Sequence, residues 1–374
     1  MMSEMVKGKF SVGVDLHKSQ FTVCVLDGSG EHQLEEIYYV NASGYEKFKL
    51  DMHTFEQEFG CEIILAVETT GNVRYFKNQM EAEGFEVLVV NTNKFKVISQ
   101  STKKNDKNDA STLAYYLYKE MLPESHIADQ SSQELRRMIK SRSLLVSTNV
   151  KLKNQIHGMM LGYGINTKGG QLQSIKKRQA LLWDLEDHGF SGAAASLKVI
   201  LQSIETIEAQ IKEIEKRLSE MTKEDEDVEL LMGIPGVGLI TATTIAAYTK
   251  DIEKRFEGDF KRFASYIGIV PSVHNSNEVV RMGRITKRGP QELRTAIVQA
   301  TMGLLRLSKR TGSWKLITDY KTMKISKGSG VSIIATTRKL ARIIFAMLNN
   351  REPFNVELMV KNKCLFTVNE VIGA

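Results

Sequence analysis

The sequence predicts an α/β domain at the N-terminus, then a helical, coiled-coil region, and then a mainly α-helical C-terminal domain. Three observations support this prediction: apolar residues alternate near the N-terminus, no proline occurs between Pro123 and Pro235, and a long heptad pattern lies within that region. The domain boundaries expected from these observations are 1–125, 126–226 and 227–374.

The first domain is expected to contain a mixed sheet. Residues 9–15 and 20–26 alternate apolar and polar side chains, which is the period of half-buried strands, and the four residues between them predict a turn. Three further strands and two helices are expected at 33–40, 62–67, 85–90, about 43–58 and about 72–83. This order of elements is that of an RNase H-like or RuvC-like α/β sheet.

The middle region carries a sustained heptad pattern. Eight apolar residues recur at alternating spacings of three and four, namely Leu197, Ile200, Ile204, Ile207, Ile211, Ile214, Leu218 and Met221. The pattern predicts a coiled coil that separates two domains or joins two protomers; the alternative is a long helix packed on the core of its own domain. The glycine-rich segment 162–170 is expected to break the preceding helix and to allow a helical hairpin.

Charge is unevenly distributed along the chain. Residues 1–125 contain 13 basic and 19 acidic residues, whereas residues 226–374 contain 23 basic and 13 acidic residues. An acidic first domain suits a metal site, and a basic last part suits a polyanion such as DNA or RNA, although a solvated basic face would have the same composition.

Composition also bears on location. The sequence has no run of 18 apolar residues and no apolar segment typical of a secretory signal, so we expect a cytoplasmic protein without a membrane segment. Cys24, Cys61 and Cys364 are too far apart to indicate a zinc site, and we expect reduced thiols.

Four acidic residues fall where such a sheet would gather carboxylates. Asp15 lies late in the first strand, Glu68 ends the strand that begins at residue 62, and Asp106 and Asp109 begin a helix three residues apart. Carboxylates in this arrangement favour Mg²⁺ or Mn²⁺ over zinc, and two such ions about 4 Å apart can activate a nucleophile and stabilise a leaving oxygen. Taken singly, each acid could instead open a turn or cap a helix. Their occurrence together favours a metal centre.

The C-terminal half contains two features that suit phosphate binding. Residues 230–246 resemble a helix-hairpin-helix, in which Gly236 and Gly238 would permit a tight turn whose backbone amides hold a phosphate; a plain turn between helices is the alternative. From 306 to 342 ten basic residues accompany one acidic residue. This stretch ends in an amphipathic helix that could cover a nucleic-acid backbone or complete the core.

Three segments together resemble the signatures of the DEDD transposases of bacterial insertion sequences. They read GVDLHKSQF, AVETTGNV and KKNDKNDA, and the third departs from the family at Asn105 and Lys107 without losing a carboxylate. The family includes the Piv-type DNA invertases and the bridge-RNA-guided serine recombinases. The resemblance covers about the first 120 residues and continues from about 228 to 352.

The resemblance implies a nucleophilic serine. It maps best onto Ser276, where Asn275 and Asn277 replace the serine and glycine usual in the family, and Ser272 is the second choice. His274 stands too close to Ser276 to suggest a Ser-His-Asp triad. A composite site is implied, in which the four carboxylates come alongside the serine and basic residues hold phosphates nearby; these basic residues are Arg281, Arg284, Lys287 and Arg288, and their alternative is a solvated basic loop.

The function implied is that of a DNA transposase or site-specific recombinase, which cuts and rejoins DNA through a Mg²⁺-assisted phosphoserine intermediate. The implied partners are donor and target DNA, a structured noncoding guide RNA, and further copies of the chain, from dimer to tetramer. The implied location is the bacterial cytoplasm, at the nucleoid when the protein is active. The alternatives are a RuvC-like Holliday-junction nuclease that uses water, a DNA invertase of the same family, and a non-catalytic nucleic-acid-binding protein.

Overall fold

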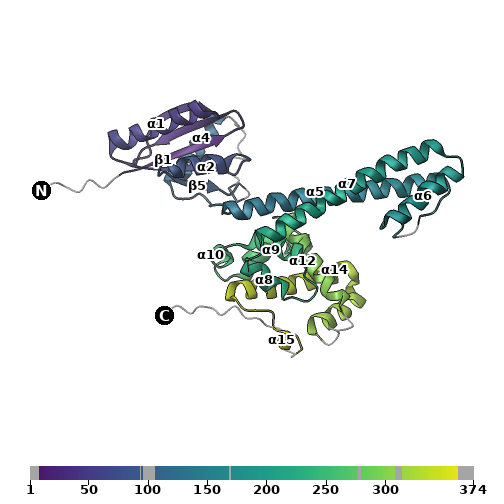
Figure 1. Cartoon of the computed structure of the whole chain (residues 1–374). Helices are drawn as coiled ribbons and strands as arrows, with labels where there is room; N and C mark the ends of the chain where they lie inside the picture. The colour runs from purple at the N-terminus through teal and green to yellow at the C-terminus, as the bar shows by residue number, and fades with distance from the viewer. Residues whose placement is uncertain are drawn as a thin grey trace. The chain divides into compact units, whose positions relative to one another are not determined.

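The computed structural model describes residues 8–92, 94–95, 106–167, 170–276, 279–307 and 314–360. The chain forms two compact units, Met1–Ile127 and Ala128–Ala374. The first is a mixed α/β unit built on a five-stranded sheet, and the second is mostly helical (Figure 1). No helix in the described ranges is long and apolar enough to cross a membrane.

The sheet of the first unit has the strand order β3-β2-β1-β4-β5. β1 (Lys9–Leu16) pairs antiparallel with β2 (Gln20–Leu26), which pairs antiparallel with β3 (His32–Tyr39). On its other side β1 pairs parallel with β4 (Glu62–Glu68), which pairs parallel with β5 (Glu86–Val90). Each strand lies within one residue of its predicted bounds, and the mixed sheet is compatible with a RuvC-like fold.

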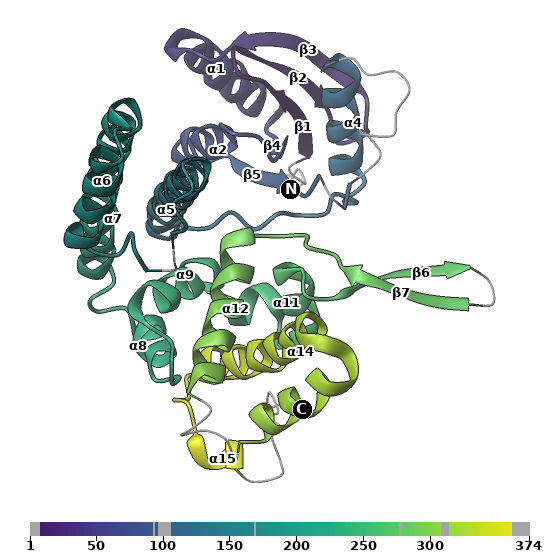
Figure 2. The ribbon, with the colours of Figure 1, turned by 90° about the vertical axis from the view of Figure 1, so that its right-hand side faces the viewer.

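Helices cover both faces of this sheet (Figure 2). α1 (Ala42–Phe59) and α2 (Val73–Ala82) pack on one face, where they form an apolar core with alternate residues of the strands. α4 (Asp106–Tyr118) packs on the other face. Because successive side chains of a strand point to opposite faces, each strand is divided between these two layers.

The close approach of α4 depends on a glycine in β1. A β-carbon built on Gly13 would lie 2.0 Å from the carbonyl oxygen of Ala110 and 2.4 Å from the amide nitrogen of Ala114. Cys24 of β2 is buried with Ala110 and Ala114 on the same face. The first turns of α4 therefore lie directly over β1, which positions the start of this helix near the end of the strand.

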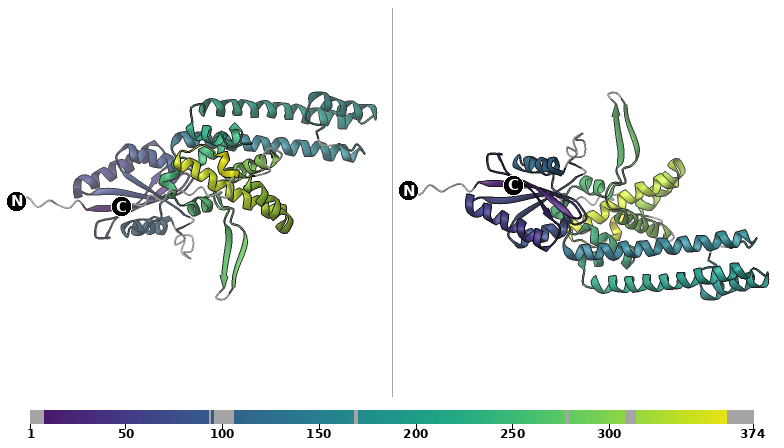
Figure 3. Two further views of the ribbon diagram at one scale, coloured as in Figure 1. Left: turned by 90° about the horizontal axis from the view of Figure 1, so that it is seen from below. Right: turned by 90° about the horizontal axis from the view of Figure 1, so that it is seen from above.

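The second unit begins with a long helical hairpin. α5 (Gln130–Gly162) and α7 (Ser191–Met221) run side by side, with α6 (Ile175–Asp187) packed against α7 (Figures 1 and 3). Within it, Leu197 and Ile204 of the heptad pattern join an apolar cluster with residues of α5 and α6. At Leu197 and Ile204 the apolar face of α7 thus packs on helices of its own chain.

The rest of the second unit is a helical core. It is formed by α8 (Glu226–Met232), α9 (Leu239–Thr249), α10 (Ile252–Phe256), α11 (Phe260–Ile267), α12 (Gln291–Arg306), α14 (Lys315–Asn350) and α15 (Val356–Val360). The long α14 consists of two helices, because Gly328 has φ 76° and ψ 169°. The amphipathic helix expected near residue 342 is the second of them, and Leu340, Ile344 and Phe345 are buried in the core.

A two-stranded antiparallel ribbon projects from this core (Figure 2). It consists of β6 (Pro271–Ser276) and β7 (Val279–Ile285), where the sequence suggested a basic loop. Two glycines fix its base: Gly268 and Gly289 have positive φ, and a β-carbon on either would lie about 2 Å from a backbone oxygen of Arg288 or Tyr266. The base of the ribbon therefore packs against the end of α11 through backbone-to-backbone contact.

Candidate functional site

Asp15 and Glu68 end two adjacent parallel strands. Val14 pairs with Val67, so the next residue in each strand is one of these two acids. By alternation Asp15 shares the face of Gly13, and Glu68 shares the face of Ala66, which packs with Leu113 and Leu117 of α4. Both carboxylates therefore belong to the face covered by α4, at the carboxyl ends of their strands.

α4 contributes the third and fourth acids predicted from the sequence. Asp109 is half-buried and directly precedes Ala110, which contacts Gly13. Asp106 begins the helix, but its side chain lies outside the described residues. Among the side chains that are described, no three or more acids, histidines or cysteines are assembled into a group that could hold a metal ion. The structure brings Asp15 and Glu68 to one edge without closing the predicted cluster.

Asp15 has a histidine neighbour. Nε2 of His17 donates to Oδ2 of Asp15 across 3.0 Å, and the Asp15 side chain is 12% exposed against 49% for His17. The backbone oxygen of His17 accepts from Nδ2 of Asn72 at 2.9 Å, which ties the β1–β2 turn to the start of α2. His17 and Asn72 were not among the predicted site residues. Their signal lay in the motifs themselves, since both lie within four residues of a predicted acid.

The segment that follows Glu68 is held on its other side as well. Oγ1 of Thr69 donates to the backbone oxygen of Val90 at the end of β5, across 2.8 Å. Oγ1 of Thr70 donates to Oδ1 of Asn72 across 3.1 Å. The polar residues of the ETTGN motif therefore fix the loop between β4 and α2 against both neighbouring segments, and they keep Glu68 at the end of its strand.

Thr22 is the cross-strand partner of Asp15 in the β1–β2 pair. Its side chain is fully buried, and its hydroxyl has no hydrogen-bond partner among the described residues. Leaving a buried hydroxyl unpaired costs about 1–3 kcal/mol. Carboxylate oxygens such as those of Asp15 and Glu68 are hard ligands, so the residues at this edge fit a divalent cation.

The predicted nucleophile lies in the second unit. Ser276 is the last residue of β6 and pairs with Val279, but its side chain, like that of Arg281, lies outside the described residues. Ser272, the second choice, packs across the ribbon, because a β-carbon on Gly283 would lie 2.3 Å from its Oγ. The backbone of Ser276 is part of a strand.

Basic residues follow Ser276 at the base of the ribbon. Arg284, Lys287 and Arg288 are exposed. The backbone amide of Lys287 donates to the oxygen of Gly268 across 3.1 Å, and Lys287 itself has φ 53°. A fixed backbone thus carries an exposed positive surface, which suits phosphate contacts.

The two glycines of the α8–α9 turn have different environments. Gly236 has φ 85°, and a β-carbon there would lie 2.7 Å from the carbonyl carbon of Gly303 in α12, so this glycine serves close packing. Gly238 is the N-cap residue of α9, and no atom of the described residues lies within 4 Å of the position that a β-carbon would take there. The open end of α9 at Gly238 is the part of this turn that a phosphate could approach.

Comparison with known proteins identifies relatives of both halves of the chain. A family model for transposases of the DEDD type matches residues 12–165, and a model for transposases of the IS116/IS110/IS902 family matches residues 228–314. The chain is 25% identical to the transposase for insertion sequence element IS1111A of Coxiella burnetii, over 92% of this chain and 90% of the relative. It is 26% identical to the transposase for insertion sequence element IS1328 of Yersinia enterocolitica, over 78% and 85%.

Proposed function

We propose that this chain, which belongs to the IS116/IS110/IS902 family of transposases, cuts and rejoins DNA through a covalent phosphoserine intermediate on Ser276. The observation that supports it most directly is the position of Asp15 and Glu68, at the ends of adjacent parallel strands and on the face covered by α4. At this edge the buried hydroxyl of Thr22 has no hydrogen-bond partner among the described residues, and the DEDD-type family model matches the residues that form the edge.

The proposed covalent step conserves the number of phosphate ester bonds. The hydroxyl of Ser276 loses its proton and its oxygen forms a bond with phosphorus, while the bond between phosphorus and the oxygen of the departing strand breaks and that oxygen takes up a proton. The same step in reverse joins the serine-linked strand to a new hydroxyl end. A divalent cation, Mg²⁺ or Mn²⁺, held by Asp15, Glu68, Asp106 and Asp109 would supply Lewis-acid polarisation of the scissile phosphate.

DNA would be held mainly through its backbone. We assign phosphate contacts to the open end of α9 at Gly238 and to the basic residues Arg281, Arg284, Lys287 and Arg288. Such contacts position DNA without reading its sequence. Strand exchange joins two DNA partners, so the proposal includes an assembly of two to four copies, and selection of the DNA by a structured noncoding RNA.

The test is to trap the covalent intermediate. The purified chain is incubated with Mg²⁺ and labelled DNA carrying the ends of its element, denatured, and mapped by mass spectrometry. We expect a DNA adduct on Ser276, which is lost in Ser276→Ala and retained in Ser272→Ala.

Other outcomes separate the alternatives. Metal-dependent cutting that persists in Ser276→Ala without an adduct would identify a nuclease that uses water. Binding that is unchanged in Asp15→Asn, together with no cutting in any divalent metal, would identify a non-catalytic nucleic-acid-binding protein.

A further inference from the structure

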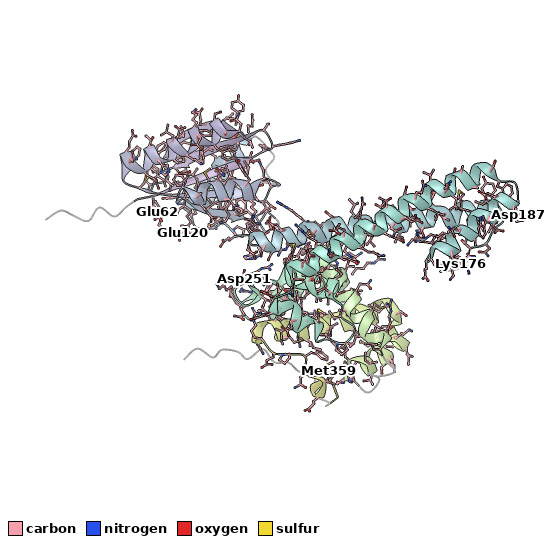
Figure 4. All side chains as sticks on the ribbon, in the orientation of Figure 1. Glu62, Glu120, Lys176, Asp187, Asp251 and Met359 are labelled. Atoms are coloured by element: carbon pink, nitrogen blue, oxygen red, sulfur yellow. The ribbon has the colours of Figure 1, made fainter. Side chains whose placement is uncertain are left out.

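The second unit contains a groove that the proposed chemistry does not use. Its volume is about 360 Å³, and residues of α11, both halves of α14, and α15 line it. The lining is largely apolar and includes Phe260, Leu316, Ala335, Ile343 and Met359. Met359, labelled in Figure 4, belongs to the short α15. A groove of this size is typical of a small organic group rather than of a helix or a duplex.

Positive charge surrounds this apolar lining. Lys315, Arg338, Lys339 and Arg342 lie around Asp319, which is the one acid among the described lining residues. Lys315 and Lys339 donate to the two oxygens of Asp319, at 3.1 and 2.5 Å. Burial would raise the pKa of Asp319, but these hydrogen bonds outweigh it and lower the pKa. The carboxylate is therefore charged and already neutralised by the lysines.

The positive charges of Arg338 and Arg342 can bind an anion. Arg342 is exposed, and its guanidinium stacks on the ring of Phe260 with 4.8 Å between its central carbon and the ring centre. Neither Arg338 nor Arg342 makes an ion pair within the described part of the chain. They are four residues apart on one helix, so both lie on the same side of the groove. The groove thus combines an apolar floor with a cationic rim.

We propose that this groove binds one unpaired nucleotide of a DNA strand. The base and sugar would contact the apolar lining, and the adjacent phosphates would meet Arg338 and Arg342, which is the combination that single-strand binding requires. A duplex cannot place a base there, because its bases are stacked and paired inside. The choice of DNA as the polymer rests on the proposed function, whereas the nucleotide chemistry rests on the groove itself.

Photocrosslinking tests the location. The full chain is mixed in EDTA with a single-stranded oligonucleotide containing 5-iododeoxyuridine, irradiated, and mapped by mass spectrometry. We expect crosslinks on the more exposed residues that line the groove, Ala335, Arg338 and Arg342. Crosslinks confined to residues outside the groove would overturn the proposal. Because EDTA prevents metal-dependent cutting, this result does not depend on whether Ser276 is the nucleophile.

Filling the groove tests the base contact without changing charge. Ala335→Leu should weaken binding of a short single strand at least about fivefold, as expected when a base loses its contact surface, and should leave duplex binding unchanged. Ser326→Leu, at an exposed position in the first half of α14 that does not line the groove, is the control. Equal affinity of Ala335→Leu and the control for the single strand would overturn the proposal. It would also be overturned if an RNA strand of the same sequence bound more tightly than DNA and if Ala335→Leu did not weaken that binding.

A second inference rests on a different observation, the buried hydroxyl of Thr22, which has no hydrogen-bond partner in the part of the chain that the structure describes. We infer that Thr22 is a positioning residue for Asp15, and that its hydroxyl donates to the Asp15 carboxylate once the site is loaded with a divalent cation. The two residues are directly opposite each other in adjacent strands, so their side chains lie on the same face. In the structure Asp15 accepts a hydrogen bond from His17, and the Thr22 hydroxyl has no hydrogen-bond partner among the described residues.

Two substitutions separate positioning from packing. Thr22→Val removes the hydroxyl but keeps the shape, so it should raise the melting temperature of the metal-free chain and weaken Mn²⁺ binding, measured by calorimetry, about tenfold or more. Thr22→Ser should restore Mn²⁺ affinity. The control is Thr336→Val in the other unit, where the buried hydroxyl of Thr336 donates a hydrogen bond to the backbone oxygen of Ser332. This substitution should leave Mn²⁺ affinity unchanged. Unchanged Mn²⁺ affinity in Thr22→Val would show that Thr22 is only a core residue.

Discussion

Gly13 and Ala110 are in backbone contact, with only 2.0 Å between the position of a β-carbon on Gly13 and the carbonyl oxygen of Ala110. Asp109 precedes Ala110, and Asp15 follows Gly13 by two residues on the same face of the sheet. One missing methyl group thus sets the distance between the helix and the strand that carry two of the predicted acids.

Gly13→Ala should therefore displace α4. We expect the free energy of unfolding to fall by about 1–3 kcal/mol, which is the usual cost of overpacking, and metal-dependent DNA cutting to be lost. Urea denaturation and a cleavage assay measure the two effects. Gly192→Ala is the control, because a β-carbon there would have no described atom within 4 Å, and it should leave both quantities nearly unchanged. Full cutting activity in Gly13→Ala would show that the position of α4 is not critical.

The stability of the helical hairpin should depend on the ion pair between Arg178 and Glu208. The Arg178 side chain is 5% exposed and donates to both oxygens of Glu208, at 2.9 and 2.8 Å. Glu208→Ala leaves this buried guanidinium without its carboxylate partner, so the free energy of unfolding should fall by about 1.5–3 kcal/mol. Breaking the exposed pair of Arg262 and Glu257 by Arg262→Gln should cost less than about 1 kcal/mol. Equal effects in urea denaturation would contradict the buried role.

Low pH should destabilise the N-terminus of α5, because its N-cap residue Asp129 becomes protonated. Burial would raise the pKa of this carboxyl, but hydrogen bonds from Ser131 and Ser132 outweigh it and lower the pKa from 3.8 to about 2. Its stabilising contribution is therefore complete above pH 4 and is lost as the pH falls from about 4 to about 2. Asp129→Asn keeps a good capping side chain but does not titrate, so stability should depend less on pH in this window. Denaturation curves at several pH values provide the measurement.

Two substitutions of Gly238 should distinguish an effect on helix capping from an effect on phosphate binding. Its backbone has φ −96° and ψ 169°, and the end of α9 is open. Gly238→Asp should not lower stability, because aspartate is a good N-cap, but its charge should weaken duplex binding if a phosphate occupies this end. Gly238→Asn provides a cap without the charge. Identical DNA affinity of the two variants, measured by fluorescence anisotropy at fixed salt, would place the phosphate contacts elsewhere.

The sequence by itself determined the secondary structure of the first unit and the strand ends that carry Asp15 and Glu68. These follow from local periodicity, because alternation and helical spacing depend only on neighbouring residues. The motifs also indicated the family, which the comparisons confirmed.

Only the tertiary structure decided which distant segments meet. It assigned the apolar face of α7 to helices of the same chain, placed Ser276 on a strand, and brought Thr22 and His17 beside Asp15. It also showed that Gly236 packs on α12, whereas Gly238 is open. A one-dimensional pattern shows which residues are apolar or small, but their partners are chosen by packing between elements far apart in the chain, where each close contact depends on the shape of both surfaces.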